Sequence, residues 1–75
     1  MAAKIIAFGQ IAEITGKELE LNVGDTDSLS LLLQENYPAL VHKKYIIAVN
    51  KKIQTHNAII DVNDVVALMP PFSGG

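Results

Sequence analysis

The sequence predicts an α+β fold, in which a mixed sheet of four to five strands carries one main helix on one face. Three observations predict this class. Short β-branched runs stand near both ends of the chain, at residues 3–9 and 65–70. Residues 17–23 alternate apolar and polar side chains, and residues 26–37 space their apolar side chains as one face of a helix does. With 75 residues, the chain has room for one such domain.

The first two strands are predicted at residues 3–9 and 17–23. The first is short, apolar and β-branched, and Gly9 closes it. The second is half-buried, with its apolar side chains on one face: Leu19, Leu21 and Val23. Residues 10–16 between the two strands are predicted to form a connector. If this connector closes a hairpin, the two strands are antiparallel.

The main helix is predicted to begin at Asp25 or Thr26, because either side chain can cap it. Asp27 then lies in the first turn, where the helix dipole favours a negative charge. One buried stripe follows the i, i+3, i+4 spacing and consists of Leu29, Leu32, Leu33 and Tyr37. Pro38 ends the helix, since a proline disfavours helical geometry in the residue before it.

Three further strands complete the prediction. Residues 44–50 form the third strand, Lys51-Lys52 form a turn, and Ile53 begins a short fourth strand or a bridge. The last strand, residues 65–70, is apolar throughout, so we place it inside the sheet beside the first strand. This order of elements is the β-grasp, or ubiquitin-like, arrangement. We expect residues 1–70 to form the domain and residues 71–75 to form a flexible, protruding Gly-Gly tail.

One face of this sheet is predicted to lack a helix. Side chains alternate across a strand, so if Lys4 reaches water, Ile6 and Phe8 share its face. Met69 is predicted on the same face, and Ile53 with it. Single exposed apolar side chains are common and carry no function in many proteins. The alternative is a docking surface beside the tail, because Met69 directly precedes the two prolines.

The composition argues against several classes of protein. The longest apolar runs have five residues, far fewer than the 18 or more of a membrane span. The chain begins without a stretch of signal-peptide length, so we expect a cytoplasmic protein. A net charge of −2 without a basic stripe argues against nucleic acid as a partner.

No constellation of catalytic residues is evident in the sequence. His42 and His56 have no carboxylate or cysteine at ligand spacing, so we expect no metal site. The serines do not lie in a strand–turn–helix nucleophile elbow and have no plausible general base. The glycines at 9, 16 and 24 are dispersed and do not form a phosphate-binding loop. We therefore expect no bound cofactor.

The C-terminal segment PPFSGG is the most distinctive feature of the sequence. Prolines hold φ near −65° and would project the chain away from the sheet, whereas glycines can pass through a narrow channel. We expect the positioning residues of the tail to be Pro70, Pro71, Phe72 and Ser73. The reactive group would be the carboxylate of Gly75, with Gly74 before it. A carboxylate is a poor electrophile, but adenylation by ATP would open it to attack by sulfur or an amine.

The sequence resembles the MoaD-type sulfur carriers of the ubiquitin-like superfamily, which are the small subunits of molybdopterin synthase. The resemblance covers essentially the whole chain. Three segments carry it: IIAFGQIAEITG, IIAVNKKI and NDVVALMPPFSGG. The family pattern Pro-Pro-x-x-Gly-Gly is more specific than a Gly-Gly end alone. Three departures are the absence of arginine, Leu68-Met69 in place of an aromatic pair, and Asn63-Asp64 in place of a Gly-Asp turn.

The resemblance implies a role and a set of partners. An E1-like adenylyltransferase would use ATP to activate Gly75, and a sulfur donor protein would convert it to a thiocarboxylate. The tail would then enter the large subunit of molybdopterin synthase, in a heterotetramer, and supply sulfur for the molybdopterin dithiolene. In the family, the positions of Phe8, Ile53 and Met69 contact the activating enzyme.

Two other interpretations remain open at this point. A sulfur carrier for thiamine synthesis shares the fold and the Gly-Gly end, but Pro70-Pro71 and the long connector from Gly9 to Gly16 argue against it. A ubiquitin-like protein modifier or a plain binding module would use the tail for an isopeptide bond or for nothing. A gain of sulfur at the C-terminal carboxylate would indicate a carrier, and attachment to lysines of other proteins would indicate a modifier.

Overall fold

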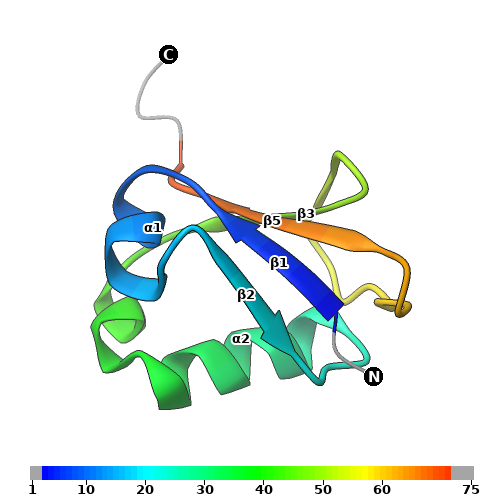
Figure 1. Cartoon of the computed structure of the whole chain (residues 1–75), viewed down its shortest axis with the longest axis horizontal. Helices are drawn as coiled ribbons and strands as arrows, with labels where there is room; N and C mark the ends of the chain where they lie inside the picture. The colour runs from blue at the N-terminus through cyan, green and yellow to red at the C-terminus, as the bar shows by residue number, and fades with distance from the viewer. Residues whose placement is uncertain (1–2, 72–75) are drawn as a thin grey trace.

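A computed structural model describes residues 3–71, which form a twisted mixed sheet with α2 packed across one face (Figure 1). The elements, in chain order, are β1 (Ala3–Ala7), α1 (Gly9–Thr15), β2 (Glu18–Leu21), α2 (Thr26–Asn36), the 3₁₀ helix η1 (Pro38–His42), β3 (Ile46–Val49), β4 (Lys52–Gln54) and β5 (Val65–Met69). The strand order is β2-β1-β5-β3-β4. Only β1 and β5 are parallel among these neighbours. This is the predicted β-grasp arrangement, with the last strand beside the first.

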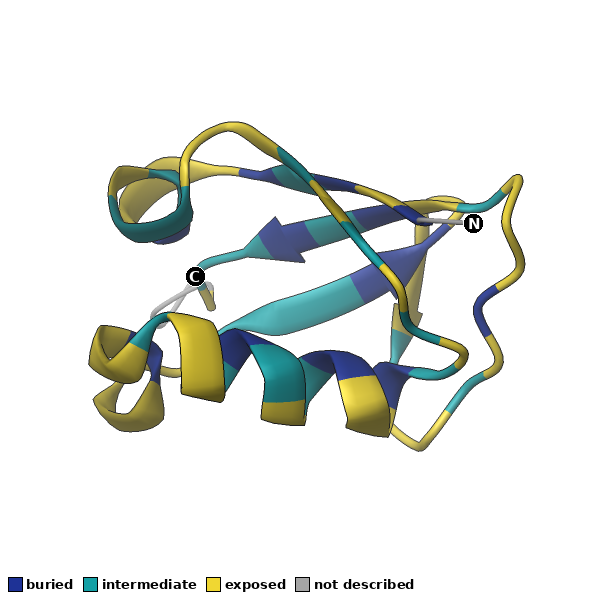
Figure 2. Cartoon of the chain, turned by 60° about the horizontal axis from the view of Figure 1, so that its bottom comes forward, coloured by how far each residue is buried: buried dark blue, intermediate teal, exposed yellow. Residues whose placement is uncertain are grey.

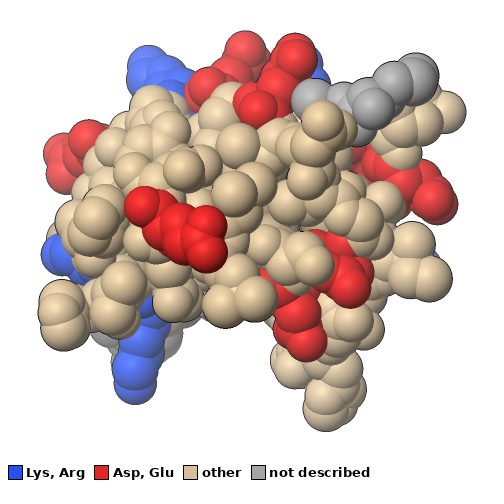
Figure 3. All heavy atoms as spheres, turned by 90° about the horizontal axis from the view of Figure 1, so that it is seen from below, with Lys and Arg blue, Asp and Glu red and all other residues tan. Residues whose placement is uncertain are grey.

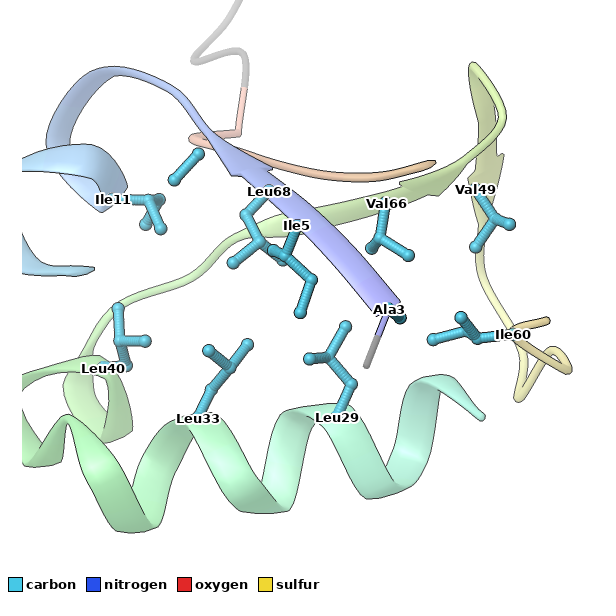
Figure 4. Close-up of a cluster of buried hydrophobic side chains, with 11 residues drawn as sticks. Ala3, Ile5, Ile11, Leu29, Leu33, Leu40, Val49, Ile60, Val66 and Leu68 are labelled. Carbon is cyan, nitrogen blue, oxygen red and sulfur yellow. The ribbon is translucent and has the colours of Figure 1, made fainter. Parts of the chain in front are cut away.

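The core lies between the sheet and α2 (Figure 4). Ile5 and Leu68 point down from the two central strands, and Leu29 and Leu33 point up from α2; all four are fully buried. Figure 2 shows the same division along α2, whose inner side is buried and whose outer side is exposed. The predicted stripe is therefore correct for Leu29 and Leu33. Leu32, predicted in the same stripe, is only half-buried.

Residues 10–16, which the sequence predicted to be a connector, belong largely to the helix α1. Ile11 is 1% exposed and packs under the end of the sheet, which explains why the segment coils instead of forming a plain loop (Figure 4). Gly16 ends the helix at φ 90°, and its N–H donates to the Ala12 carbonyl at 2.7 Å. The Thr15 hydroxyl donates to the Ile11 carbonyl at 3.1 Å.

The turn between β3 and β4 lies one residue earlier than predicted. Asn50 and Lys51, with φ of 51° and 71°, occupy the two loop positions, whereas Lys52 already pairs with Val49. Two positive φ values are what a two-residue hairpin of the right twist requires, and asparagine tolerates them better than most residues. The prediction of a Lys51-Lys52 turn was therefore wrong by one position, while the short fourth strand at Ile53 is confirmed.

The start of α2 is held by side chains from two segments. Asp25 is the N-cap, and its carboxylate accepts the Ser28 N–H at 2.8 Å, as predicted. Asn57, far along the chain, accepts the Asp27 N–H at 2.9 Å. The Thr26 hydroxyl accepts the Ala58 N–H at 2.9 Å. These bonds fix the loop after β4 against the helix end.

Acidification below about pH 4 is expected to weaken the fold through Asp25 and Asp64. Hydrogen bonds from Ser28 and then Asn57 lower the pKa of Asp25, and those from Asp61 and Asn50 lower the pKa of Asp64. A lowered folded-state pKa stabilises the protein above the unfolded-state pKa, and this stabilisation disappears as pH falls through the folded-state value. Urea titrations at a series of pH values from 7 downward measure this loss of stability. The double variant Asp25→Asn/Asp64→Asn should show a shallower loss of stability than the parent; an equal loss would contradict the assignment.

Candidate docking face and tail base

The pairing register defines one sheet surface that α2 does not cover, here called the open face. Lys4 and Ile6 of β1 lie beside Val65 and Ala67 of β5. Because alternate residues share a face, the same surface contains residues from all five strands. Its members are Lys4, Ile6, Glu18, Glu20, Ile46, Ala48, Ile53, Val65, Ala67 and Met69.

Phe8, which follows β1, also lies on the open face, which it shares with Ile53 of β4 and Met69 of β5. Phe8 directly follows β1, and its N–H continues the ladder to the Leu68 carbonyl at 2.9 Å. Its side chain is 49% exposed and that of Ile53 is 57% exposed, whereas Met69 is half-buried. The alternation inferred from Lys4 is therefore correct, since Ile5 and Ala7 are buried on the other side.

A shallow apolar hollow of about 400 Å³ lies on this surface. Its lining residues are Ile6, Phe8, Asn50, Lys51, Val65 and Ala67. Asn50 fixes one rim, because its side-chain oxygen accepts the Val65 N–H at 3.0 Å and its amide donates to Asp64 at 2.7 Å. These two hydrogen bonds fix the hairpin loop against the start of β5. The hollow is an exposed apolar recess, a feature that marks interaction sites in other proteins.

The two sides of the sheet differ in charge. The view of the α2 side in Figure 3 shows acidic side chains spread over it and few basic ones. The sequence explains this, because residues 22–42, which follow β2 and include α2, contain three carboxylates and neither lysine nor arginine. The open face is mainly apolar by comparison, with Lys4 opposite Glu20 at one edge. The open face is thus the candidate surface for apolar contact with a partner.

The base of the predicted tail lies at the end of the central strand β5. Pro70 follows Met69 and is half-buried, and Pro71 is exposed. Gly9, at the first turn of α1, lies directly against the Pro70 ring. The other predicted tail residues are Phe72, Ser73, Gly74 and Gly75, which lie outside the described residues. The tail base therefore adjoins Met69 and Phe8, two members of the predicted docking surface.

Residues 3–71 contain no group of three or more His, Asp or Glu side chains that could hold a metal ion. His42 and His56 are both exposed. Neither helix in this range has the length and apolarity that crossing a membrane requires. The described residues thus offer a docking surface and a tail base, and the chemistry of the tail is considered below.

Sequence reasoning missed two residues that shape this region. Gly9 was interpreted only as the end of a strand, although it also contacts Pro70. Asn50 was placed in a strand, although its positive φ and its hydrogen bonds fix the rim of the hollow. Asn50-Lys51 between two apolar runs is a signal that could have located the turn. Nothing local in the sequence reveals the contact of Gly9.

The strand order and the single main helix define the class of β-grasp proteins, and the sequence adds a glycine pair at residues 74–75. Within that class, a model of the ThiS family matches residues 5–75. The chain belongs to the ThiS family of sulfur carriers.

Two relatives carry a more specific description. The molybdopterin synthase sulfur carrier subunit of Arabidopsis thaliana is 31% identical over 78 residues, covering 96% of this chain and 81% of that protein. The molybdopterin synthase sulfur carrier subunit of Dictyostelium discoideum is 30% identical, covering 96% of this chain and 94% of that protein.

Solved structures agree on the fold. A chain in the complex of subunits 1 and 2 of molybdopterin-converting factor from Helicobacter pylori superposes with a TM-score of 0.76 at 27% identity, and both chains are covered completely. The small archaeal modifier protein 1 of Methanosarcina acetivorans superposes with a TM-score of 0.79 at 23% identity, covering 100% of this chain and 99% of that one. At that identity the second likeness supports the β-grasp fold and nothing finer.

Proposed function

We propose that this protein is the sulfur carrier subunit of a molybdopterin synthase and that the carboxylate of Gly75 carries the sulfur. The observation that supports this most strongly is the identity of 30–31% with two molybdopterin synthase sulfur carrier subunits, across 96% of this chain. The Helicobacter pylori structure, a complex of two subunits of molybdopterin-converting factor, supports a second subunit as partner.

The proposed chemistry takes place on Gly75. A carboxylate oxygen attacks the α-phosphorus of ATP in an E1-like adenylyltransferase, and pyrophosphate leaves. A donor protein then supplies sulfur at the oxidation level of sulfide, which attacks the acyl carbon and displaces AMP. The product is a thiocarboxylate, formed without net oxidation or reduction. In the large subunit this sulfur attacks a carbon of the pterin precursor, and an oxygen substituent of that carbon leaves. Water then hydrolyses the acyl–sulfur bond, which restores the Gly75 carboxylate and leaves the sulfur in the dithiolene.

The body of the protein supplies docking and direction instead of catalytic groups. The open face presents Phe8, Ile53 and Met69 to the activating enzyme, where burial of exposed apolar side chains supplies binding energy. Pro70 and Pro71 hold φ near −65° and direct the chain from the sheet. Phe72 and Ser73 continue the tail, and Gly74 offers no side chain to a narrow channel.

Mass spectrometry tests the proposed function. Incubation with an adenylating enzyme, ATP and a sulfur donor should replace one oxygen of the Gly75 carboxylate by sulfur, and the large subunit should then accept that sulfur. Attachment to lysines of other proteins would instead indicate a modifier. No change in mass would contradict a carrier role.

A sulfur carrier for thiamine synthesis is the second candidate, because the matching family model is that of ThiS. Both candidates predict the thiocarboxylate, so its formation does not separate them. The two candidates differ in the enzyme that receives the sulfur. Transfer to the large subunit of molybdopterin synthase supports the first proposal, whereas transfer only to a thiazole-forming enzyme supports the second.

The open-face substitution Ile53→Glu is expected to weaken the complex with the activating enzyme about tenfold or more, because it puts a charge into an apolar contact. Ile59→Glu is the matched control. Ile59 is 75% exposed, more than Ile53, but it lies in a bridge to Asp25 at the start of α2. Titration calorimetry gives both dissociation constants. Equal weakening by the two variants would show that apolar exposure in general, and not the open face, governs binding.

A further inference from the structure

Gly9 and Pro70 come from opposite ends of the chain and touch at the tail base. The parallel register pairs Ala7 with Leu68, so Phe8 and Gly9 run beside Met69 and Pro70 as both strands end. Two backbone bonds hold the first of these segments: Phe8 donates to the Leu68 carbonyl, and Ile11 donates to the Phe8 carbonyl at 3.2 Å. Gly9 is thus fixed in position on the side of Pro70.

The space between them has no room for a side chain. A Cβ built on Gly9 would lie 3.0 Å from Cγ of Pro70 and 3.5 Å from Cδ. Carbon atoms in favourable contact stand about 3.5–4.0 Å apart, so the first distance is a steric overlap. The φ of Gly9 is +56°, a conformation that costs other residues energy in any case. Two independent features therefore favour glycine here.

We propose that Gly9 is a positioning residue for the tail, since its bare Cα lets the Pro70 ring lie against α1 and so sets the direction in which the chain leaves the sheet. The inference rests on the proposed function, in which the tail must reach a partner's active site. Pro70 cannot absorb a displacement by rotating φ, because its ring fixes that angle. A side chain at Gly9 is therefore expected to displace Pro70, and with it the start of the tail at Pro71.

Gly16 provides a matched control at the other end of α1. Its φ is +90° and its ψ is 163°, a region that residues other than glycine rarely occupy. A Cβ built on Gly16 would meet no atom within 4 Å. Gly16→Ala therefore introduces backbone strain without touching the tail base. Gly9→Ala and the larger Gly9→Leu introduce strain and also displace Pro70.

Steady-state adenylation by the activating enzyme separates positioning from docking. The open face remains intact in all variants, so KM for this protein should stay unchanged. We expect kcat to fall about tenfold or more for Gly9→Leu, since misplacement of a reacting group by about 1 Å can cost far more than that. The kcat of Gly9→Ala should fall less, and Gly16→Ala should keep the parental kcat although its fold is destabilised. Assays run at a temperature where circular dichroism shows every variant folded.

A double-mutant cycle with Pro70→Ala tests the contact itself. Without the ring, the added side chain has nothing to displace, so Gly9→Leu should lower kcat much less in the Pro70→Ala background than in the parent. Equal losses in both backgrounds would overturn the proposal. So would a parental kcat for Gly9→Leu, or a loss that appears in KM alone.

Nuclear magnetic resonance supplies a readout that does not depend on activity. The parent should show a nuclear Overhauser effect between the Gly9 α-protons and the Pro70 ring, and Gly9→Ala, but not Gly16→Ala, should shift the Pro71 resonances. If the parent is never adenylated, the proposed function fails, and this measurement alone decides the contact. Absence of the Overhauser effect, or equal shifts in both variants, would overturn the positioning role.

Discussion

Deletion of Gly75 is expected to abolish thiocarboxylate formation and sulfur transfer while the free energy of unfolding stays within about 0.5 kcal/mol of the parent. This result is expected because the proposed reactive group belongs to the predicted tail, residues 71–75, and not to the predicted domain. Every residue of the described core precedes Met69 in the chain, so the burial that stabilises the fold comes from residues before the tail. The carboxylate of Gly74 would remain, but one residue short of its place in the partner.

Two further variants sharpen this prediction. An alanine appended after Gly75 keeps both glycines but moves the carboxylate, and it should abolish transfer as the deletion does. Ser73→Ala leaves the carboxylate at the same residue and should retain most of the activity. Mass spectrometry after incubation with the activating enzyme, ATP and a sulfur donor measures the first effect, and urea titration measures stability. Transfer by the deleted protein would refute Gly75 as the carrier, and its unfolding would refute the division at residue 70.

Much of the fold could be predicted because local patterns and burial agree. The alternation of residues 17–23, the capped leucine stripe from Asp25 and the apolar run of residues 65–70 each specify an element. These three also specify how the sheet and helix pack. The parity argument placed Ile6 and Phe8 on one face from Lys4 alone, because successive side chains of a strand point to opposite faces.

The remaining features depend on tertiary contacts that no local pattern encodes. The helix α1 has seven residues, Gly9–Thr15, and is too short for its own sequence to specify it; burial of Ile11 under the sheet decides its shape. The hairpin turn lies one residue earlier than predicted because Val49 of β3 pairs with Lys52 of β4, and the local sequence does not specify this pairing. The contact of Gly9 with Pro70 joins positions 61 residues apart. Each of these requires knowledge of a distant partner.

Three consecutive leucines in α2 offer a direct test of how the helix packs, and the largest expected loss of stability. Leu31 is 65% exposed, Leu32 is half-buried and Leu33 is fully buried. Leu33→Ala should cost about 2–5 kcal/mol, because it removes buried methyl groups and leaves a cavity between α2 and the sheet. For a domain of this size, whose total stability is of order 4–11 kcal/mol, that is a large fraction.

The neighbouring positions are the controls. Leucine and alanine are both good helix formers, so the three substitutions change helix propensity almost equally and differ only in burial. Leu31→Ala should fall within about 0.5 kcal/mol of the parent, and Leu32→Ala between the two. Urea titrations at pH 7 give all three values. Because Gly75 is not affected, each variant that remains folded should still acquire sulfur at the parental rate, the reverse of the Gly75 deletion. Equal losses of stability at Leu31 and Leu33 would show that α2 does not pack on the sheet through Leu33.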